Sequence, residues 1–391
     1  MKTNLKNIVT SVIFLVVIVG VFLGCLLHES KVYSESERRP LESFPTYEST
    51  YDSEKDMNFL LTLNKDIKDY INSFDKYTLD QFPARDLMRR IKSFVELNIF
   101  NKKDNGDMYV KDGYISEIDG KLDVESVNKA NKVFNNIYNK YLVGKADKII
   151  LSVIPDKHYF MGESNGYPSY DYNELVSLLC NGLNENIEYV DIFSELELED
   201  FYKTDTHWSQ DKIVDVAKKL VTALGVADEY SFEYDVNEVD MDFYGIYAGK
   251  LGVKGEADII RYLTSDTINN CKLYDYELSK YVDIYDFSKN NYEQSNGFDP
   301  YNFFLSGAKK GIMTIENPSQ DNGKELVVFR DSYGSSIAPL LVDGYSKVHF
   351  VDIRVTTAVV ANFVLNGFEG KDVMFLYSSM IINNSSELNL M

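Results

Sequence analysis

The sequence has little tryptophan, proline or cysteine. Its 391 residues include Trp 1, Pro 8 and Cys 3, against Tyr 29 and Phe 23. A chain so rich in aromatic residues and so poor in proline does not have the composition of a disordered or collagen-like protein. Three cysteines are too few for a disulfide scaffold, and Cys25 lies in an apolar run. Cys180 and Cys271 could form one bridge, but we expect both to be small buried side chains.

Acidic residues outnumber basic residues in the chain. The chain has 40 Lys and Arg against 61 Asp and Glu, which gives a net charge of −21. Nucleic-acid binding depends on cationic contacts with phosphates, so this balance disfavours a nucleic-acid partner. Hydrophobic residues make up 45% of the chain, enough for a sizeable core.

The longest apolar run lies near the N-terminus. Residues 8–27 (IVTSVIFLVVIVGVFLGCLL) carry no charge, and about 20 such residues cross a bilayer as a helix. Lys2 and Lys6 precede the run, so the positive-inside rule assigns residues 1–7 to a cytoplasmic tail and the rest of the chain to the outside. A cleaved signal peptide is the alternative, but no small-x-small cleavage site follows the run. The residues before Cys25 are too bulky for a lipoprotein signal. We therefore expect a single-pass membrane protein with an extracytoplasmic C-terminal domain.

The rest of the chain divides into a stem with a helical arm and a larger domain. Residues 31–47 lack apolar periodicity, whereas Tyr51 to about Phe100 follows a helical pattern that Gln81–Asp86 interrupts. We assign residues 28–105 to the stem and arm, and residues 106–391 to the larger domain. There, apolar strands at 148–155, 187–193, 325–329, 348–351 and 373–377 alternate with helices at 173–184, 208–224, 337–341 and 357–365. This alternation predicts an α/β fold with a parallel sheet covered on both faces. The rhythm breaks at about 228–324, which we interpret as a long insertion.

Ser332 follows a predicted buried strand and precedes a predicted helix. Reacting groups in parallel sheets collect at the carboxyl ends of the strands. The N–H groups at the start of the helix suit a developing oxyanion. A serine at this place is also a common helix cap, so the position alone leaves both interpretations open.

Asp205 and His207 supply the groups that a nucleophilic serine needs. A serine hydroxyl needs a base such as histidine, and that base needs an acid on its other ring nitrogen. In an extended segment alternate residues point the same way, so Asp205 can reach His207. The alternative is that Asp205 caps a helix and His207 is a bystander. A metal site is a less favoured interpretation of these residues, because no second histidine lies at the spacing of metal ligands.

These motifs resemble those of the DHHW protein family. The resemblance starts from Asp205-x-His207-Trp208 and Asp331-Ser332-Tyr333. Further short motifs agree in order and spacing: Glu37-x-Arg39, Phe82-Pro83-x-Arg85-Asp86, Pro155-x-Lys157-x-x-Phe160, Phe243-Tyr244-Gly245, Asp299-x-Tyr301-x-Phe303-Phe304 and Asp352-x-Arg354. The family is similar to the alginate O-acetylation proteins, a permuted branch of the SGNH hydrolases.

The resemblance implies a three-layer SGNH-hydrolase-like fold and an acyl-serine mechanism. Ser332 would be the nucleophile, His207 the base and Asp205 its orienting acid. The implied activity is O-acetylation of a cell-surface polysaccharide without a cofactor or metal, with a membrane-bound acyltransferase as acetyl donor. An acetyl esterase with the same triad and a catalytically silent glycan-binding envelope protein are the alternatives.

The chain departs from the family pattern. Thr206 stands where the family signature has histidine, and Arg330 replaces the usual glycine before Asp-Ser. The sequence also has no match to the Gly and Asn that complete the oxyanion hole of SGNH enzymes, so the second oxyanion donor is unassigned. Arg354, Tyr333 and Arg330 are candidates for oxyanion or substrate contacts, with a structural ion pair as the alternative for Arg354 and packing as the alternative for Tyr333.

Overall fold

The computed structural model describes residues 2–51, 59–253, 255–287, 299–307 and 310–388. The chain forms two compact units, of which the first comprises Met1–Lys102 with Gly249–Val253 and the second most of the remaining chain. The start of the predicted helical arm, at 52–58, and parts of the predicted insertion, at 254, 288–298 and 308–309, lie outside the described residues. The predicted limits of tail, anchor, arm and catalytic domain stay predictions.

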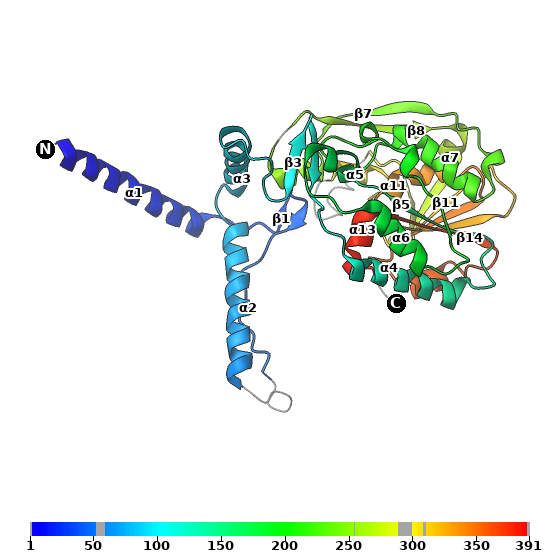
Figure 1. Cartoon of the computed structure of the whole chain (residues 1–391), viewed down its shortest axis with the longest axis horizontal. Coiled ribbons are helices and arrows are strands. Elements are labelled where there is room, and N and C mark those ends of the chain that lie inside the picture. The colour runs from blue at the N-terminus through cyan, green and yellow to red at the C-terminus, as the bar shows by residue number, and fades with distance from the viewer. Residues whose placement is uncertain (1, 52–58, 254, 288–298, 308–309, 389–391) are drawn as a thin grey trace. The chain divides into compact units, whose positions relative to one another are not determined.

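A single large sheet forms the centre of the second unit (Figure 1). Its strands are β5 (Ile149–Ile154), β6 (Glu188–Tyr189), β9 (Lys272–Asp275), β10 (Lys280–Val282), β11 (Ile312–Glu316), β12 (Glu325–Arg330), β13 (Lys347–Val351) and β14 (Lys371–Ser378). They form an 8-stranded sheet in the order β10-β9-β11-β13-β12-β14-β5-β6. The strands from β13 to β6 pair in parallel, and β11, β9 and β10 extend the other edge in antiparallel pairing. The predicted, mainly parallel α/β sheet is confirmed.

Both faces of the sheet are covered, because alternate strand residues belong to different cores. Val328 and Met374 contribute to one hydrophobic cluster, and their neighbours Val327 and Phe375 to the other. The first cluster includes residues of α7 (Val214–Ala223), α11 (Gly334–Ile337) and the 3-10 turn η9 (Ala338–Leu341). The second includes residues of α4 (Val124–Ile137), α6 (Tyr172–Gly182), α12 (Ala358–Val364) and α13 (Ser379–Asn383). The result is a three-layer fold.

The structure differs from the sequence prediction at three places. The predicted insertion contributes β9, β10 and β11 to the sheet, because apolar residues such as Leu273 and Met313 join the hydrophobic core on one face of the sheet. Two further strands of the insertion, β7 (Asp235–Phe243) and β8 (Asp258–Thr264), form a separate antiparallel pair. The strand predicted at 187–193 is only β6, beyond which the chain turns into a 3-10 helix at Phe193–Glu195. The helix predicted from Trp208 begins at Val214, because Trp208 forms a β-bridge with Phe201.

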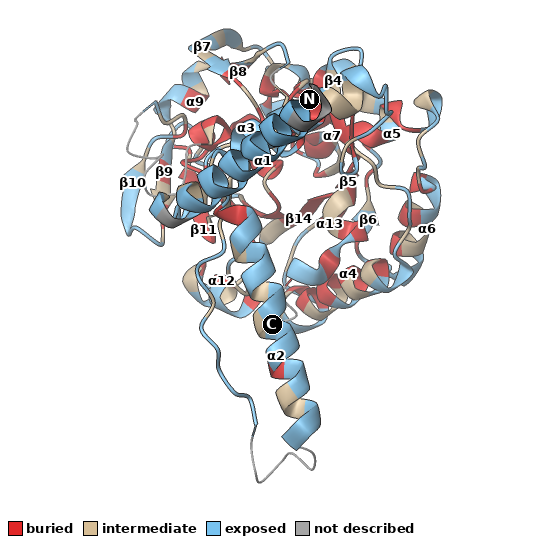
Figure 2. Ribbon diagram, turned by 90° about the vertical axis from the view of Figure 1, so that its left-hand side faces the viewer, coloured by how far each residue is buried: buried red, intermediate tan, exposed pale blue. Residues whose placement is uncertain are grey.

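The first unit contains the N-terminal helix and the arm. One helix among the described residues is long and apolar enough to cross a membrane, over Leu5–Cys25 (21 residues) within α1 (Lys2–Leu27). A short hairpin, β1 (Tyr33–Ser34) and β2 (Arg39–Pro40), precedes α2 (Phe59–Asp80) and α3 (Arg85–Phe94), which continues as a π-helical turn, η1 (Val95–Ile99). Figure 2 shows α1 and α2 mostly exposed, in contrast to the buried strands.

Ion pairs connect the hairpin to the arm. Glu37 contacts Arg39 (3.3 Å), Arg85 (2.5 Å) and Arg89 (3.3 Å). Asp80, at the end of α2, accepts hydrogen bonds from both Nη atoms of Arg39 (2.9 and 2.6 Å). Hydrogen bonding from Arg39, together with its charge, lowers the pKa of Asp80. The residues Glu37-x-Arg39 and Arg85, noted for the family resemblance, therefore stabilise this unit.

Candidate functional site

Ser332 lies in the turn between β12 and α11. Asp331 fixes this turn, because its Oδ1 accepts the N–H of Tyr333 (3.0 Å) and its Oδ2 accepts the N–H of Ser378, at the end of β14 (2.8 Å). A Cβ added at Gly334 would lie 2.7 Å from the Cβ of Arg330, so a larger residue does not fit there. The turn holds Ser332 partly exposed at the carboxyl edge of the parallel strands.

The structure brings the three predicted site residues together. His207 Nε2 lies 2.8 Å from Ser332 Oγ, and His207 Nδ1 lies 2.5 Å from Asp205 Oδ1. Since an ionised carboxylate can only accept, Nδ1 carries the proton and Nε2 is left to accept from the serine hydroxyl. The ring of Tyr301 stacks on the imidazole, with centroids 3.7 Å apart and planes at 5°. This stacking fixes the orientation of the ring.

Asp205 is buried and held by backbone groups. Its Oδ1 also accepts the N–H of His207 (3.1 Å), and its Oδ2 accepts the N–H of Ile246 (2.8 Å). The preceding residue, Gly245, packs directly on Asp205, since a Cβ added there would lie 2.2 Å from the Asp205 Cβ. Hydrogen bonds from N–H groups favour the ionised form of a carboxylate. The acid is thus positioned both by its own loop and by Gly245 and Ile246, which are far away in the sequence.

A buried lysine and a partly buried aspartate hold the loop that carries Asp205 and His207. Lys157 Nζ donates to the carbonyl oxygens of Tyr202 (2.8 Å) and Lys203 (3.1 Å). Its side chain is fully buried, which lowers its pKa to about 7. Asp258, on β8, accepts the N–H of Lys203 (2.7 Å) and both the N–H (2.7 Å) and the hydroxyl (2.5 Å) of Thr204. The loop is therefore clamped immediately before Asp205.

The three further candidates are engaged with protein groups. Arg354 Nε and Nη2 donate to the two carboxylate oxygens of Asp352 (2.9 and 2.7 Å), which is the ion pair considered as its alternative. The Tyr333 hydroxyl is buried and donates to the carbonyl of Thr206 (2.7 Å). Arg330 is fully buried, and its Nη1 donates to the carbonyl of Asp331 (3.2 Å) and to Ser335 Oγ (3.1 Å). A role for any of them in binding substrate stays a prediction.

Trp208 and His158 are core residues. Trp208 is fully buried, and its Nε1 donates to Ser336 Oγ (2.9 Å). His158 is buried between the Tyr109 hydroxyl (2.9 Å) and the Pro168 carbonyl (2.8 Å).

A cavity of about 370 Å³ lies next to the Asp205–His207 loop. Two of its lining residues contact the Thr206 hydroxyl, Tyr247 at 3.1 Å and Met380 at 3.6 Å. Apart from Ile118, the remaining lining residues are polar: Glu117, Asp119, Lys121, Asp123, Asp156, Asn383 and Asn384. Burial raises the pKa of Asp119 to about 6. Within the described part of the chain, no group of three or more His, Cys, Asp or Glu side chains could hold a metal ion.

Sequence comparison gives one short curated match. No protein-family profile matches the chain. The tRNA-specific 2-thiouridylase MnmA of Rickettsia canadensis is 30% identical over 169 residues, which is 43% of this chain. The chain spans 42% of the length of that curated relative.

Structural comparison gives longer matches. A DHHW family protein from Eubacterium siraeum is similar with a TM-score of 0.59 and 21% identity, over 72% of this chain and 93% of that protein. Bacillus cereus PatB1, solved with a sulfonyl adduct, is similar with a TM-score of 0.55 and 14% identity, over 70% of this chain and 95% of that protein. At these identities the likeness concerns the fold. The chain has the fold of a DHHW family protein, in agreement with the resemblance of its motifs.

Proposed function

We propose that this chain is a serine-dependent O-acetyltransferase that acts outside the cytoplasmic membrane on a cell-surface polysaccharide. The observation that carries the proposal is the continuous chain of hydrogen bonds from Asp205 through His207 to Ser332, at 2.5 and 2.8 Å. A buried acid, a correctly oriented imidazole and a partly exposed hydroxyl are the parts of an acyl-transfer triad.

The proposed reaction has two halves. Ser332 Oγ attacks the acetyl carbonyl of the donor while its proton passes to His207 Nε2, and the leaving group departs with that proton, which leaves an acetyl-serine. A polysaccharide hydroxyl then gives its proton to Nε2 and attacks the acetyl-serine, which releases the Ser332 hydroxyl with the proton from Nε2. Asp205 stays ionised throughout and holds the Nδ1 proton.

The negative charge that develops on the acetyl carbonyl oxygen during the attack needs hydrogen-bond donors. The Ser332 N–H has no acceptor among the described hydrogen bonds, which supports a role as one oxyanion donor. Arg354, Tyr333 and Arg330 all donate to protein groups, so the second donor is not assigned.

The polysaccharide is proposed to approach through the cavity beside Thr206. Its polar lining suits sugar hydroxyls, and its volume of about 370 Å³ is in the range of small-ligand sites. The net charge of −21 argues against the tRNA substrate that the name of the curated relative indicates. The apolar helix over Leu5–Cys25 supports membrane anchorage, which would keep the enzyme near a membrane-bound acyltransferase that supplies acetyl groups.

A sulfonyl fluoride tests the nucleophile, because this electrophile modifies activated hydroxyls and PatB1, of similar fold, has been solved with a sulfonyl adduct. We expect stoichiometric labelling of the full-length protein at Ser332, read by peptide mass spectrometry. Ser332→Ala should abolish labelling, and Ser335→Ala, in the same turn but fully buried, is the matched control. Labelling that persists in Ser332→Ala would overturn the proposal.

The acceptor is tested in cells. Deletion of the gene should lower the O-acetyl content of the surface polysaccharide, and full-length protein should restore it while Ser332→Ala should not. An increase on deletion would instead identify an acetyl esterase. An unchanged content would favour a silent glycan-binding protein.

A further inference from the structure

Helix α3 presents an apolar face to solvent. With about 100° per residue, Leu87, Met88, Ile91 and Phe94 fall on one side of the helix. Each of these side chains is about half exposed, from 47% for Ile91 to 58% for Phe94. Two strongly exposed residues, Ile99 and Phe100, follow at the end of η1. Large apolar side chains rarely gather on a surface unless the surface binds something.

The opposite side of α3 is docked and fixes which way the apolar face points. Arg89 Nη2 donates to the carbonyls of Gly249 (3.0 Å) and Lys250 (2.5 Å). One turn later, Ser93 Oγ donates to the carbonyl of Leu251. Because these partners belong to the same compact unit as α3, the helix cannot roll to bury its apolar side.

Cations border the apolar face on both sides. Arg90 and Lys92 flank the stripe formed by Leu87, Ile91 and Phe94, and both are exposed. No described hydrogen bond or ion pair engages either side chain. Arginine and lysine at the edges of an apolar stripe extend their charged ends towards a polar layer above it.

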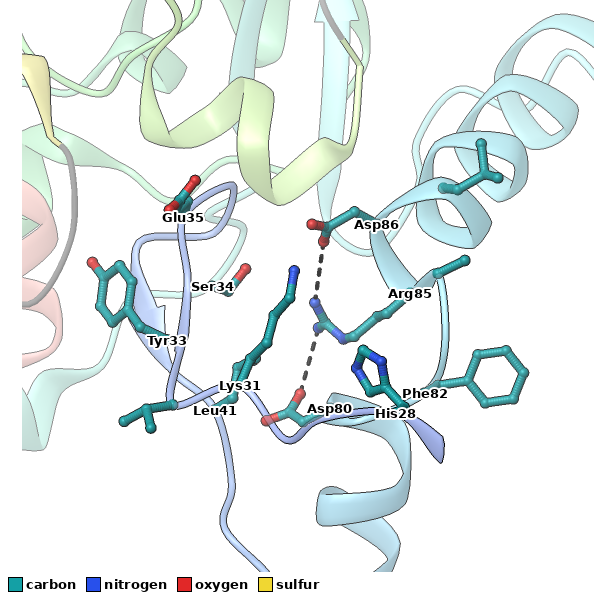
Figure 3. A pocket seen from close by; sticks show the side chains of 13 residues that line it. His28, Lys31, Tyr33, Ser34, Glu35, Leu41, Asp80, Phe82, Arg85 and Asp86 are labelled. Carbon is teal, nitrogen blue, oxygen red and sulfur yellow. Dashed lines mark ion pairs between the residues drawn. The ribbon is translucent and has the colours of Figure 1, made fainter. Parts of the chain in front are cut away.

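The start of α3 lies at the end of the proposed anchor. Pro83, in the turn before α3, lies next to α1, since a Cβ added at Gly24 would stand 3.5 Å from the Pro83 Cγ. Residues that follow the anchor and residues that begin α3 line one pocket, of about 510 Å³ (Figure 3). In that pocket Arg85 contacts Asp80 (3.5 Å) and Asp86 (3.7 Å), so its charge is already balanced. Figure 3 shows His28 and Lys31, just beyond the anchor, beside the first residues of α3.

We propose that α3 with η1 is an interfacial helix that binds the outer surface of the membrane. Its apolar side would enter the boundary between headgroups and acyl chains, and Arg90 and Lys92 would bind the phosphates of anionic phospholipids. The inference rests on the membrane anchorage in the proposed function but not on the acyl-transfer chemistry. A lipid surface fits better than a protein groove, because the stripe has cations along both edges and the anchor holds it at the bilayer.

Fluorescence quenching by brominated lipids tests the contact. Trp208, the single tryptophan and fully buried in the second unit, gives the background emission of the full-length protein. In Phe94→Trp protein reconstituted in vesicles of phosphatidylcholine and phosphatidylglycerol, we expect a loss of emission with lipid brominated on the acyl chain, beyond that of the unmodified protein. The loss should be larger for bromines near the headgroup than for bromines near the chain end, because interfacial helices lie only about 5–10 Å deep.

Two controls separate this contact from chance collision and from the anchor itself. Phe363→Trp is a matched exchange near the end of α12, at an 82% exposed position of the second unit, and should show no added quenching. Arg90→Glu with Lys92→Glu should reduce the quenching of Phe94→Trp, while sulfonyl labelling of Ser332 in detergent stays unchanged. Quenching of Phe94→Trp no greater than that of the unmodified protein, or equal to that of Phe363→Trp, would overturn the proposal. If Ser332 is not the nucleophile, the sulfonyl labelling would fail and the quenching would be unaffected.

Discussion

Gly245 offers a sharp test of how the acid is positioned. A Cβ added by Gly245→Ala would lie 2.2 Å from the Cβ, 2.3 Å from the Cα and 2.5 Å from the N of Asp205. Carbon atoms in contact are normally about 3.5–4.0 Å apart, so either segment must move by more than about 1 Å. Such a movement breaks the contact between the carboxylate and His207 Nδ1, which is 2.5 Å long in the structure.

We expect Gly245→Ala to lower the catalytic rate strongly. A displacement of about 1 Å in catalytic machinery costs on the order of 10²-fold in rate. The assay is kcat/KM with a chromogenic acetyl ester, together with the rate of sulfonyl labelling of Ser332. Gly255→Ala is the matched control, because the nearest atom to a Cβ added there is 4.0 Å away; it should react at the unmodified rate.

A folding control keeps this prediction decisive. Circular dichroism and the melting temperature show whether Gly245→Ala is folded. If it is not, Ile246→Pro removes the N–H that donates to Asp205 Oδ2 (2.8 Å), at the start of α8 (Ile246–Leu251), where proline is tolerated. Loss of one hydrogen bond to a charged group should cost about tenfold in rate. Unmodified rates in a folded Gly245→Ala protein would refute the reasoning.

Three further predictions follow from the same structure. Ser332→Ala and His207→Ala should each abolish ester turnover, with the double variant little worse than either, since triad members act as a unit; additive losses would contradict the triad. Lys157→Met should lower kcat by about tenfold or more, because it frees the carbonyls of Tyr202 and Lys203 that hold the loop, whereas Lys203→Met, which removes an ion pair with exposed Glu256, should have no effect. Glu325 accepts from His349 (3.0 Å) and pairs with Lys371 (2.7 Å), and this lowers its pKa to about 2. Its folded pKa lies below the unfolded value, so its stabilisation is present above about pH 4.3 and is lost as the pH falls through about 2. Glu325→Gln should therefore lower the melting temperature at pH 7 by a few degrees, and the difference from the unmodified protein should vanish near pH 2, while Glu188→Gln, from an exposed ion pair, should change little at either pH.

The sequence predicts the parallel part of the sheet because those strands are buried on both faces. All residues of β5 are buried, and such strands read as continuous apolar runs. The antiparallel edge was not predicted as part of the sheet, since β9 and β10 are short, β9 alternates buried with less buried positions and β10 has no buried position. An alternating pattern over so few residues does not separate a strand from a loop.

The candidate site was predicted where its signal is local. Asp205 and His207 lie two residues apart, and Ser332 stands between an apolar strand and a helix, so both features are visible in short windows of sequence. The groups that support them are not. Asp205 is held by the N–H of Ile246, and its loop by carbonyl oxygens that accept from Lys157. Lys157 belongs to a motif of the family resemblance, but its partners are backbone groups, which leave no trace in residue identity.

Some supporting residues did carry a signal whose meaning only the fold supplies. Gly245 and Tyr301 belong to motifs that contributed to the family resemblance without an assigned role. The structure gives each a contact with the proposed triad, Gly245 against Asp205 and Tyr301 stacked on His207. Asp258 had no such signal, because one acid in an acidic, irregular segment does not stand out.

Thr206 shows why the departure from the family signature leaves the proposed triad intact. Residues 203–207 form bends in the structure, where the spacing had suggested an extended segment. Within these bends Asp205 and His207 meet each other, while the Thr206 hydroxyl contacts Tyr247 (3.1 Å) and the Met380 sulfur (3.6 Å), two residues that line the cavity. Exchange of histidine for threonine at this position therefore alters the wall of the proposed polysaccharide site. The proton path from Ser332 through His207 to Asp205 does not pass through it.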